Sequence, residues 1–122
     1  MKTLIVEDDA VSRMMLQEIL EEYSEVVCVS NGAEALKVFL TDTFDLVCLD
    51  LNMPQLDGHE VLAYIRGYES LKGSHTRVLI TSMMKNPANV FRAFHGDADG
   101  YLAKPFESEQ LINYLKDFKL IE

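Results

Sequence analysis

Four short apolar segments of this sequence end in polar side chains suited to metal and phosphate chemistry. In chain order the endings are an acid pair, a single carboxylate, two hydroxyls and an amine: Glu7 and Asp8, Asp50, Thr81 and Ser82, and Lys104. Carboxylates bind hard divalent cations, whereas an ammonium and a hydroxyl can stabilise the oxygens of a phosphoryl group during its transfer. Brought together, these side chains would form one site for a metal ion and a phosphoryl group.

The segments that precede these residues are typical of parallel strands buried on both faces. They are continuous apolar runs at 4–6, 46–49, 78–80 and 101–103, separated by stretches with helical periodicity. Ligands of such sheets bind at the carboxyl ends of the strands, so we expect the polar endings to meet in space. With a further strand at 25–29, the sequence predicts an α/β fold with a five-stranded parallel sheet, doubly wound by five helices.

Apolar spacing predicts how the first helix packs. Its expected buried stripe consists of Val11, Met14, Met15, Leu16, Ile19 and Leu20. Met14, Met15 and Met84 are expected to fill core or helix-packing space and not to bind a cofactor.

Capping residues mark where the next three helices begin. Asn31, Asp57 and Asn86 have the types and positions of N-caps, and Glu60 lies three residues after Asp57. The polar stretch 68–76 is predicted to be a loop.

Length and composition describe a single globular unit. A chain of 122 residues with 48% hydrophobic and 25% charged residues can bury one core, so we expect one domain over 1–122 and no output domain. The formal net charge of −9 disfavours direct nucleic-acid binding, which depends on clustered Lys and Arg. No segment has the apolar length of a membrane span or a signal region, so we expect no membrane partner and a cytoplasmic location. Cys28 and Cys48 lie in apolar runs and are expected to be reduced core residues.

In combination, these motifs resemble the receiver domain of two-component response regulators. The resemblance covers essentially the whole chain and rests, in order, on Leu4-Ile5-Val6-Glu7-Asp8-Asp9, Asp50-Leu51-Asn52-Met53-Pro54, Asp57-Gly58, Thr81-Ser82 and Lys104-Pro105-Phe106. It implies a flavodoxin-like fold that accepts a phosphoryl group from a histidine kinase or phosphotransfer protein, using magnesium. It also implies a signalling protein and not an enzyme, apart from catalysis of its own phosphorylation and dephosphorylation.

Asp50 is the expected phosphoacceptor, because a carboxylate at a strand end can attack phosphorus and form an acyl phosphate. Glu7 and Asp8 would place two further negative charges beside it, and a bound cation would relieve their repulsion. Oxygen-only ligands suit Mg²⁺. By resemblance, Asp8, Asp50 and the backbone carbonyl of Asn52 hold the ion and Glu7 acts through water, although the family often has Asp where Glu7 stands. The adjacent Asp9 is assigned to capping the first helix.

Lys104 and Thr81 are expected to supply the positive charge and the hydrogen-bond donor that phosphoryl transfer requires. By resemblance, the peptide bond between Lys104 and Pro105 is cis, and this geometry aims the amine into the site. Ser82 and the backbone amides after Asp50 would complete the phosphate cradle, where a larger residue than Ser82 would block access.

The resemblance also implies how the signal leaves the site. Thr81 would shift towards the phosphoryl group, and the aromatic residue three positions before the lysine, Tyr101, would turn inward. This change would bias a surface made from the fourth helix, fifth strand and fifth helix towards a downstream protein target. The alternative for Tyr101 is an edge-strand aromatic without a switch role. The chain is expected to be a monomer or a phosphorylation-dependent dimer.

Met83, two residues after Thr81, is expected to border the path of the water that hydrolyses the acyl phosphate. In the family, this position and Asn52 are associated with the lifetime of the phosphorylated state. Methionine cannot orient a water by a strong hydrogen bond, so we expect slower dephosphorylation than with Glu. The three histidines have no ligand spacing and are assigned no metal or relay role: His59, His75 and His95.

Other functions remain open from the sequence. The chain could be a constitutive protein-interaction module, a phosphorelay intermediate or a receiver excised from a longer chain. A receiver that had lost its chemistry would be expected to lack Asp50, a member of the acid pair or Lys104, and all are present. A hydrolase with an aspartate nucleophile and magnesium would need an added cap or substrate loop. The sequence therefore favours the phosphoacceptor.

Overall fold

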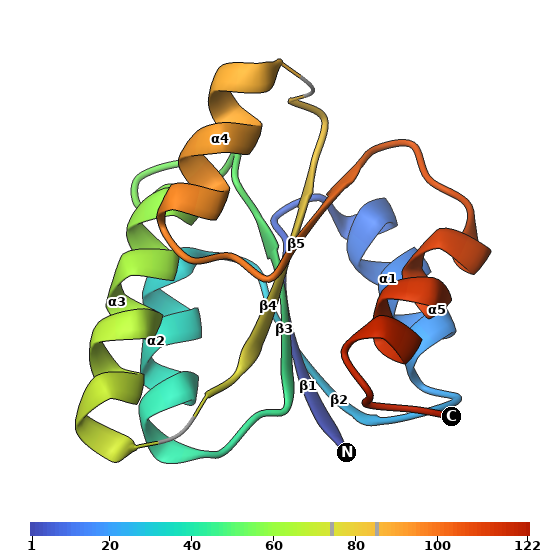
Figure 1. Ribbon diagram of the computed structural model, residues 1–122, viewed down its shortest axis with the longest axis horizontal. Helices are drawn as coiled ribbons and strands as arrows, with labels where there is room; N and C mark the ends of the chain where they lie inside the picture. The colour runs from blue at the N-terminus through green and yellow to red at the C-terminus, as the bar shows by residue number, and fades with distance from the viewer. Residues whose placement is uncertain (74, 85) are drawn as a thin grey trace.

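A computed structural model describes residues 1–73, 75–84 and 86–122, and Figure 1 shows a sheet with helices on both faces. Strands and helices alternate along the chain as β1 (Lys2–Val6), α1 (Ala10–Leu20), β2 (Glu25–Val29), α2 (Gly32–Thr41), β3 (Leu46–Asp50), α3 (Gly58–Lys72), β4 (Arg77–Ser82), α4 (Pro87–His95), β5 (Gly100–Ala103) and α5 (Ser108–Asp117). The predicted α/β architecture is confirmed. Within these residues, none of the helices is both long enough and apolar enough to cross a membrane.

The five strands are all parallel and lie in the order β2-β1-β3-β4-β5. The chain first places β2 on one side of β1 and then returns to place β3 on the other side. In doubly wound sheets, ligands bind outside the carboxyl ends of the strands at this reversal of strand order. The topology therefore predicts a ligand site at the carboxyl ends of β1 and β3.

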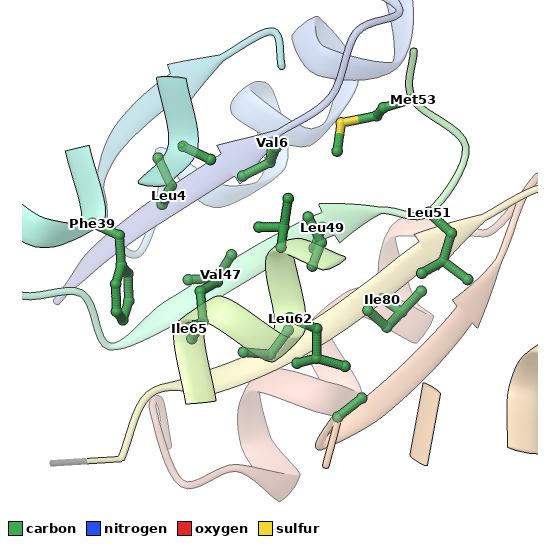
Figure 2. Close-up of a cluster of buried hydrophobic side chains, with 14 of the residues drawn as sticks. Leu4, Val6, Phe39, Val47, Leu49, Leu51, Met53, Leu62, Ile65 and Ile80 are labelled. Atoms are coloured by element: carbon green, nitrogen blue, oxygen red, sulfur yellow. The ribbon is translucent and has the colours of Figure 1, made fainter. Parts of the chain in front are cut away.

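The central strands are buried on both faces, as their continuous apolar sequences predict. Successive side chains of a strand point to opposite faces, so Leu4 and Val6 join one core cluster while Ile5 joins the other. Figure 1 shows α2, α3 and α4 on one face of the sheet and α1 with α5 on the other. Figure 2 shows the first cluster, in which Leu62 and Ile65 of α3 lie against the strands.

Side chains cap the first turns of four helices where the sequence predicts them. The N-cap oxygen accepts the N–H three residues further on, at 2.8 Å for Asp9 and 2.9 Å for Asn31, Asp57 and Asn86. Each bond satisfies a backbone donor that has no partner within its helix. The hydrogen bonds from Ser12 hold the pKa of Asp9 below its usual value. The assignment of Asp9 to helix capping is confirmed.

The predicted buried stripe of α1 is wrong in its N-terminal half. Leu16 and Leu20 are buried, but Val11, Met14 and Met15 are 65%, 60% and 52% exposed. A helix turns by about 100° per residue, so Val11 and Met15 form a second row next to the row of Leu16 and Leu20. Only the row of Leu16 and Leu20 packs into the core beneath the helix. The exposed residues lie towards the start of the helix.

The predicted loop at 68–76 is also wrong in part, because α3 continues to Lys72. Gly73 ends the helix in the left-handed conformation, with φ of 70°, and its N–H donates to the carbonyl of Glu69 at 2.8 Å. Ser74, within the predicted loop, lies outside the described residues. The polar residues are misleading here because Glu69, although charged, is only 5% exposed. Its burial depends on a network of partners.

Arg66 on α3 is the centre of that network, at the edge of the sheet where β4 and β5 begin. Its guanidinium donates to the carboxylates of Glu69 at 2.5 Å and Asp99 at 2.7 Å, and to the carbonyl of Thr76 at 2.7 Å. The three charged side chains are between 6% and 13% exposed. Burial raises the pKa of Asp99, but the Val78 N–H and the neighbouring cations outweigh it and hold that pKa below its usual value. The network joins α3 to both strands at the edge opposite the polar endings.

Replacing Arg66 by Met is expected to lower the free energy of unfolding by roughly 3 kcal/mol, because it leaves two buried carboxylates without their main partner. Urea unfolding at neutral pH measures the loss. Arg92→Met, at an exposed position of α4, is the matched control and should change stability by about 0.5 kcal/mol or less. A similar small change in both variants would contradict the prediction.

Candidate functional site

Strand register places the predicted polar endings at one edge of the sheet. The last pair of β1 and β3 is in register, so Glu7 follows β1 at the level of Asp50. Asp50 is paired with Thr81 on β4, and Lys104 directly follows β5, whose last residue pairs with Ser82. The convergence expected from the sequence is therefore present.

Three carboxylates form the centre of this site. Ligand oxygens of Glu7, Asp8 and Asp50 all lie within 4.8 Å of one another. Asp8 is exposed, whereas Glu7 is fully buried and Asp50 is 5% exposed. Burial and the neighbouring Glu7 raise the pKa of Asp50 to about 7, so Asp50 takes up a proton close to neutral pH, and a bound cation would displace it.

Lys104 supplies the positive charge. Its ammonium forms an ion pair with Oε1 of Glu7, and the side chain of Lys104 is 14% exposed. The peptide bond between Lys104 and Pro105 is cis, as predicted. Among the described residues, Oε2 of Glu7 is buried and has no hydrogen-bond partner. One half of a buried carboxylate is therefore available to a further ligand.

Thr81 and Ser82 differ in how their hydroxyls are used. Thr81 is fully buried, and its Oγ1 finds no hydrogen-bond partner in the described part of the chain. The Oγ of Ser82 accepts the N–H of Met84 at 3.0 Å and so stabilises the β4–α4 connection. A buried hydroxyl without a partner is energetically unfavourable, and an acceptor placed beside Asp50 would satisfy it. The part of Ser82 in a phosphate cradle stays a prediction.

A cavity of about 340 Å³ opens above the acids. Its lining residues are Glu7, Asp8, Asp9, Ser12, Asp50, Asn52, Met83 and Lys104. Met83 is 75% exposed and also borders an adjoining apolar pocket of about 240 Å³ formed with Met15 and Phe106. The cavity is large enough to admit a hydrated ion and a phosphoryl group beside Asp50.

The connection from β3 to α3 keeps the rim of the cavity close to Asp50. The N–H of Asn52 donates to Oδ1 of Asp50 at 3.3 Å. A Cβ on Gly58 would lie 2.4 Å from the Asp50 carbonyl oxygen and 2.6 Å from the Cα of Leu51, so only glycine fits at the start of α3. This close approach gives a physical role to the Asp57-Gly58 motif.

Tyr101 links the end of β4 to β5. Its hydroxyl donates to the carbonyl of Met84, three residues after Thr81, and its ring is partly buried. The carbonyl of Tyr101 accepts the hydroxyl of Tyr114 on α5 at 3.0 Å. A displacement of Met84 would therefore change the contacts that Tyr101 makes, and through Tyr101 the position of β5 relative to α5.

Sequence reasoning missed two residues at this site. Ser12 lines the cavity, and Arg13 donates from Nη1 to the carbonyl of Glu7 at 2.8 Å and to that of Asp8 at 3.4 Å. A signal was available, because Arg13 is the only basic residue in α1 and follows three consecutive acids. Its contact with carbonyls could not be inferred from the sequence.

The donor set fits a hard divalent cation. All candidate ligand atoms are oxygens, and Oε2 of Glu7, which has no partner in the described part of the chain, is a further acceptor for a metal-bound water. Mg²⁺ takes few protein ligands and retains several waters, which agrees with a cavity that is open above Asp8. The site can thus hold a cation beside a carboxylate nucleophile and an ammonium.

Comparison with known proteins identifies the family. A family model for the response regulator receiver domain matches residues 3–116. The chemotaxis protein CheY of Halobacterium salinarum is 31% identical over 117 residues, covering 95% of this chain and 94% of that protein. The structure of Vibrio cholerae chemotaxis protein CheY4 has a TM-score of 0.87 at 30% identity, covering 96% of this chain and 97% of the other. The sensory/regulatory protein RpfC of Xanthomonas campestris is 29% identical over 96% of this chain, which corresponds to 16% of RpfC.

The chain belongs to the response regulator receiver domain family. The predicted resemblance and flavodoxin-like fold are confirmed. Receiver domains are phosphoacceptor signalling modules of two-component systems and are not conventional enzymes. The acid cluster corresponds to the kind of site at which such domains bind Mg²⁺.

Proposed function

We propose that this chain accepts a phosphoryl group on Asp50 from a histidine kinase or phosphotransfer protein, in a reaction that requires Mg²⁺. The observation that carries the proposal is the meeting of three carboxylates, an ammonium and a buried hydroxyl at the carboxyl ends of four parallel strands. A structural ion pair would need only one acid for Lys104. Two additional acids and a raised pKa at Asp50 are better explained by a site that receives a cation and an anion.

Asp8, Asp50 and the backbone carbonyl of Asn52 would hold the ion, with Glu7 acting through water. Bound Mg²⁺ would neutralise the acid cluster and the oxygens of the incoming group. Asp50 must then be deprotonated, since its carboxylate is both ligand and nucleophile. The displacement of its proton is the first requirement for reaction near neutral pH.

In the transfer step, one carboxylate oxygen of Asp50 forms a bond to phosphorus while the bond from phosphorus to the donor's imidazole nitrogen breaks. The Lys104 ammonium would leave Oε1 of Glu7, at least in part, to contact a phosphoryl oxygen. The Thr81 hydroxyl would donate to another oxygen and so gain the partner that it lacks among the described residues. Hydrolysis would later return Asp50 to its free form.

The output surface would be α4, β5 and α5. Movement of Thr81 would shift the β4–α4 connection, which Tyr101 contacts through the carbonyl of Met84. On α4, Phe91 and Phe94 are 72% and 47% exposed, and such aromatic residues suit a protein partner. Phosphorylation would therefore change the affinity of this surface for a downstream protein target, or for a second copy of the chain.

A second possibility is that the chain is a receiver module read by constitutive binding, or a relay module of a longer protein. The match to RpfC favours only the module of a longer protein, because there the matching segment makes up 16% of the protein. The same chemistry at Asp50 would serve a relay, whereas a constitutive module would not need phosphorylation. A test of phosphorylation therefore separates the constitutive module from the two phosphoacceptor cases.

Intact mass after incubation with acetyl phosphate and Mg²⁺ tests the proposal. The expected result is one labile phosphoryl group, absent in Asp50→Asn and absent without Mg²⁺. If no adduct forms, beryllofluoride binding to the native chain, measured by NMR shifts, tests the site without a phosphodonor. Failure of both would overturn the phosphoacceptor and favour the constitutive module.

Met83→Glu is expected to speed the decay of the acyl phosphate by roughly threefold to tenfold, because a carboxylate at the cavity rim can orient the attacking water. The decay of the phosphorylated species, followed by mass in the absence of donor, measures the rate. Met83→Leu keeps an apolar side chain and should decay at the native rate. Equal or slower decay in Met83→Glu would contradict the prediction.

A further inference from the structure

We infer that Arg13 is a positioning residue for the metal site, an inference that rests on the function proposed above. Its guanidinium binds the backbone that carries the acid pair and not the carboxylates themselves. Nη1 lies 2.8 Å from the carbonyl oxygen of Glu7 and 3.4 Å from that of Asp8. Of the carboxylates in the described residues, none forms an ion pair with Arg13.

The geometry of the acid pair explains why such a contact is needed. Neighbouring residues of a strand point to opposite faces, yet oxygens of Glu7 and Asp8 both lie within 4.8 Å of Asp50. The chain must therefore leave strand geometry at this point, and it bends at Asp8. Carbonyls in a bend lose the partners that a sheet provides and need other donors.

The bend is held on each side. The N–H of Glu7 donates to the carbonyl of Val29 at 3.1 Å, which continues the pairing of β1 with β2. Asp9 accepts the N–H of Ser12 at 2.8 Å and starts α1. Between these two anchors, Arg13 is the side chain that binds the carbonyls of the acid pair. We expect it to fix the direction in which both carboxylates point.

The charge of Arg13 and its contacts with the backbone predict opposite changes in Mg²⁺ affinity when the side chain is removed. As a nearby cation, Arg13 repels Mg²⁺, so its removal should tighten metal binding by electrostatics alone. As the group that orders the acid pair, its removal should weaken metal binding, and residues that orient metal ligands typically contribute about 10-fold to 100-fold in affinity. The sign of the change in Kd therefore identifies the dominant effect.

Titration of the full chain with Mg²⁺ by calorimetry tests the inference, with Arg13→Met, Arg13→Lys and Lys37→Met compared with the native protein. The expected result is a Kd raised by about tenfold in Arg13→Met and partly restored in Arg13→Lys, which keeps one donor group. Lys37→Met, at an exposed position of α2, removes the same charge and should leave the Kd unchanged.

Thermal unfolding without metal separates positioning from general stability. Tighter or unchanged Mg²⁺ binding in Arg13→Met, with native protein that binds normally, would overturn the inference even if the Tm falls. If the native chain itself fails to bind Mg²⁺, the proposed metal site fails, and the inference about Arg13 fails with it. The acetyl phosphate assay on the native chain then reports separately on Asp50.

Discussion

Lys104→Met is expected to lower the rate of phosphorylation by acetyl phosphate by about 10²-fold to 10³-fold, the usual effect of removing one group that stabilises transferred charge. Among the described residues, Lys104 is the one cation that forms an ion pair with a carboxylate of the acid cluster, and it directly follows β5, the strand that pairs with β4. The methylene stem that packs near the cavity is largely kept in Met. The loss should therefore reflect the missing ammonium.

Metal binding distinguishes this effect from damage to the site. The Lys104 ammonium competes with a cation for Glu7, so Lys104→Met should bind Mg²⁺ at least as tightly as the native chain. Mass measurements over time give the phosphorylation rate, and calorimetry gives the Kd for Mg²⁺. Lys116 is an exposed residue of α5, so Lys116→Met serves as the matched control and should react at the native rate. A normal rate in Lys104→Met, or a lost metal site, would contradict the assigned role.

The strand ends could be predicted from the sequence because burial on both faces leaves a simple signal. A strand such as β3 is apolar at every position until Asp50, and its carboxyl end is fixed by the direction of the chain. Parallel pairing then brings Asp50 beside Thr81 without any knowledge of the helices. In this fold, the polar residues that meet at the strand ends can therefore be predicted from the sequence.

Helix faces were less predictable, because burial depends on which row of side chains meets the sheet. Met15 and Leu16 are adjacent and equally apolar, yet Met15 is 52% exposed and Leu16 is 1% exposed. The opposite error occurs at Glu69, which the sequence places in an exposed loop but which is buried. A carboxylate is buried only when partners such as Arg66 satisfy it. Those partners come from elements that the local sequence does not identify.

The contacts within the site were the least predictable. The sequence indicated that Glu7 and Lys104 would be near each other, but not that Lys104 would bind Glu7 and leave Thr81 without a partner among the described residues. Side-chain pairing depends on distances of a few ångströms that register alone does not determine. Arg13 was missed for the same reason, because its partners are carbonyls and carry no residue signature.

Asp50→Asn is expected to stabilise the metal-free protein by up to about 4 kcal/mol near pH 8 and to have little effect near pH 4. Burial and Glu7 raise the pKa of Asp50 from 3.8 to about 7, so the folded state binds a proton more tightly than the unfolded state does. Stability contributed by that proton is present below pH 4 and is lost as the pH rises towards 7. Asparagine is neutral throughout and avoids this loss.

Mg²⁺ should reverse the order of stability. A ligand that binds only the folded state raises the free energy of unfolding, and the native acid cluster offers one more negative charge than Asp50→Asn. Thermal unfolding at several pH values, with and without Mg²⁺, measures both effects, and Asp117→Asn, at an exposed position of α5, is the control. Lower stability of Asp50→Asn near pH 8 without metal would contradict the raised pKa. If the added stability of Asp50→Asn over the native chain is the same with and without Mg²⁺, Asp50 is not a metal ligand. The carboxylate that destabilises the empty site should stabilise the site that holds the ion.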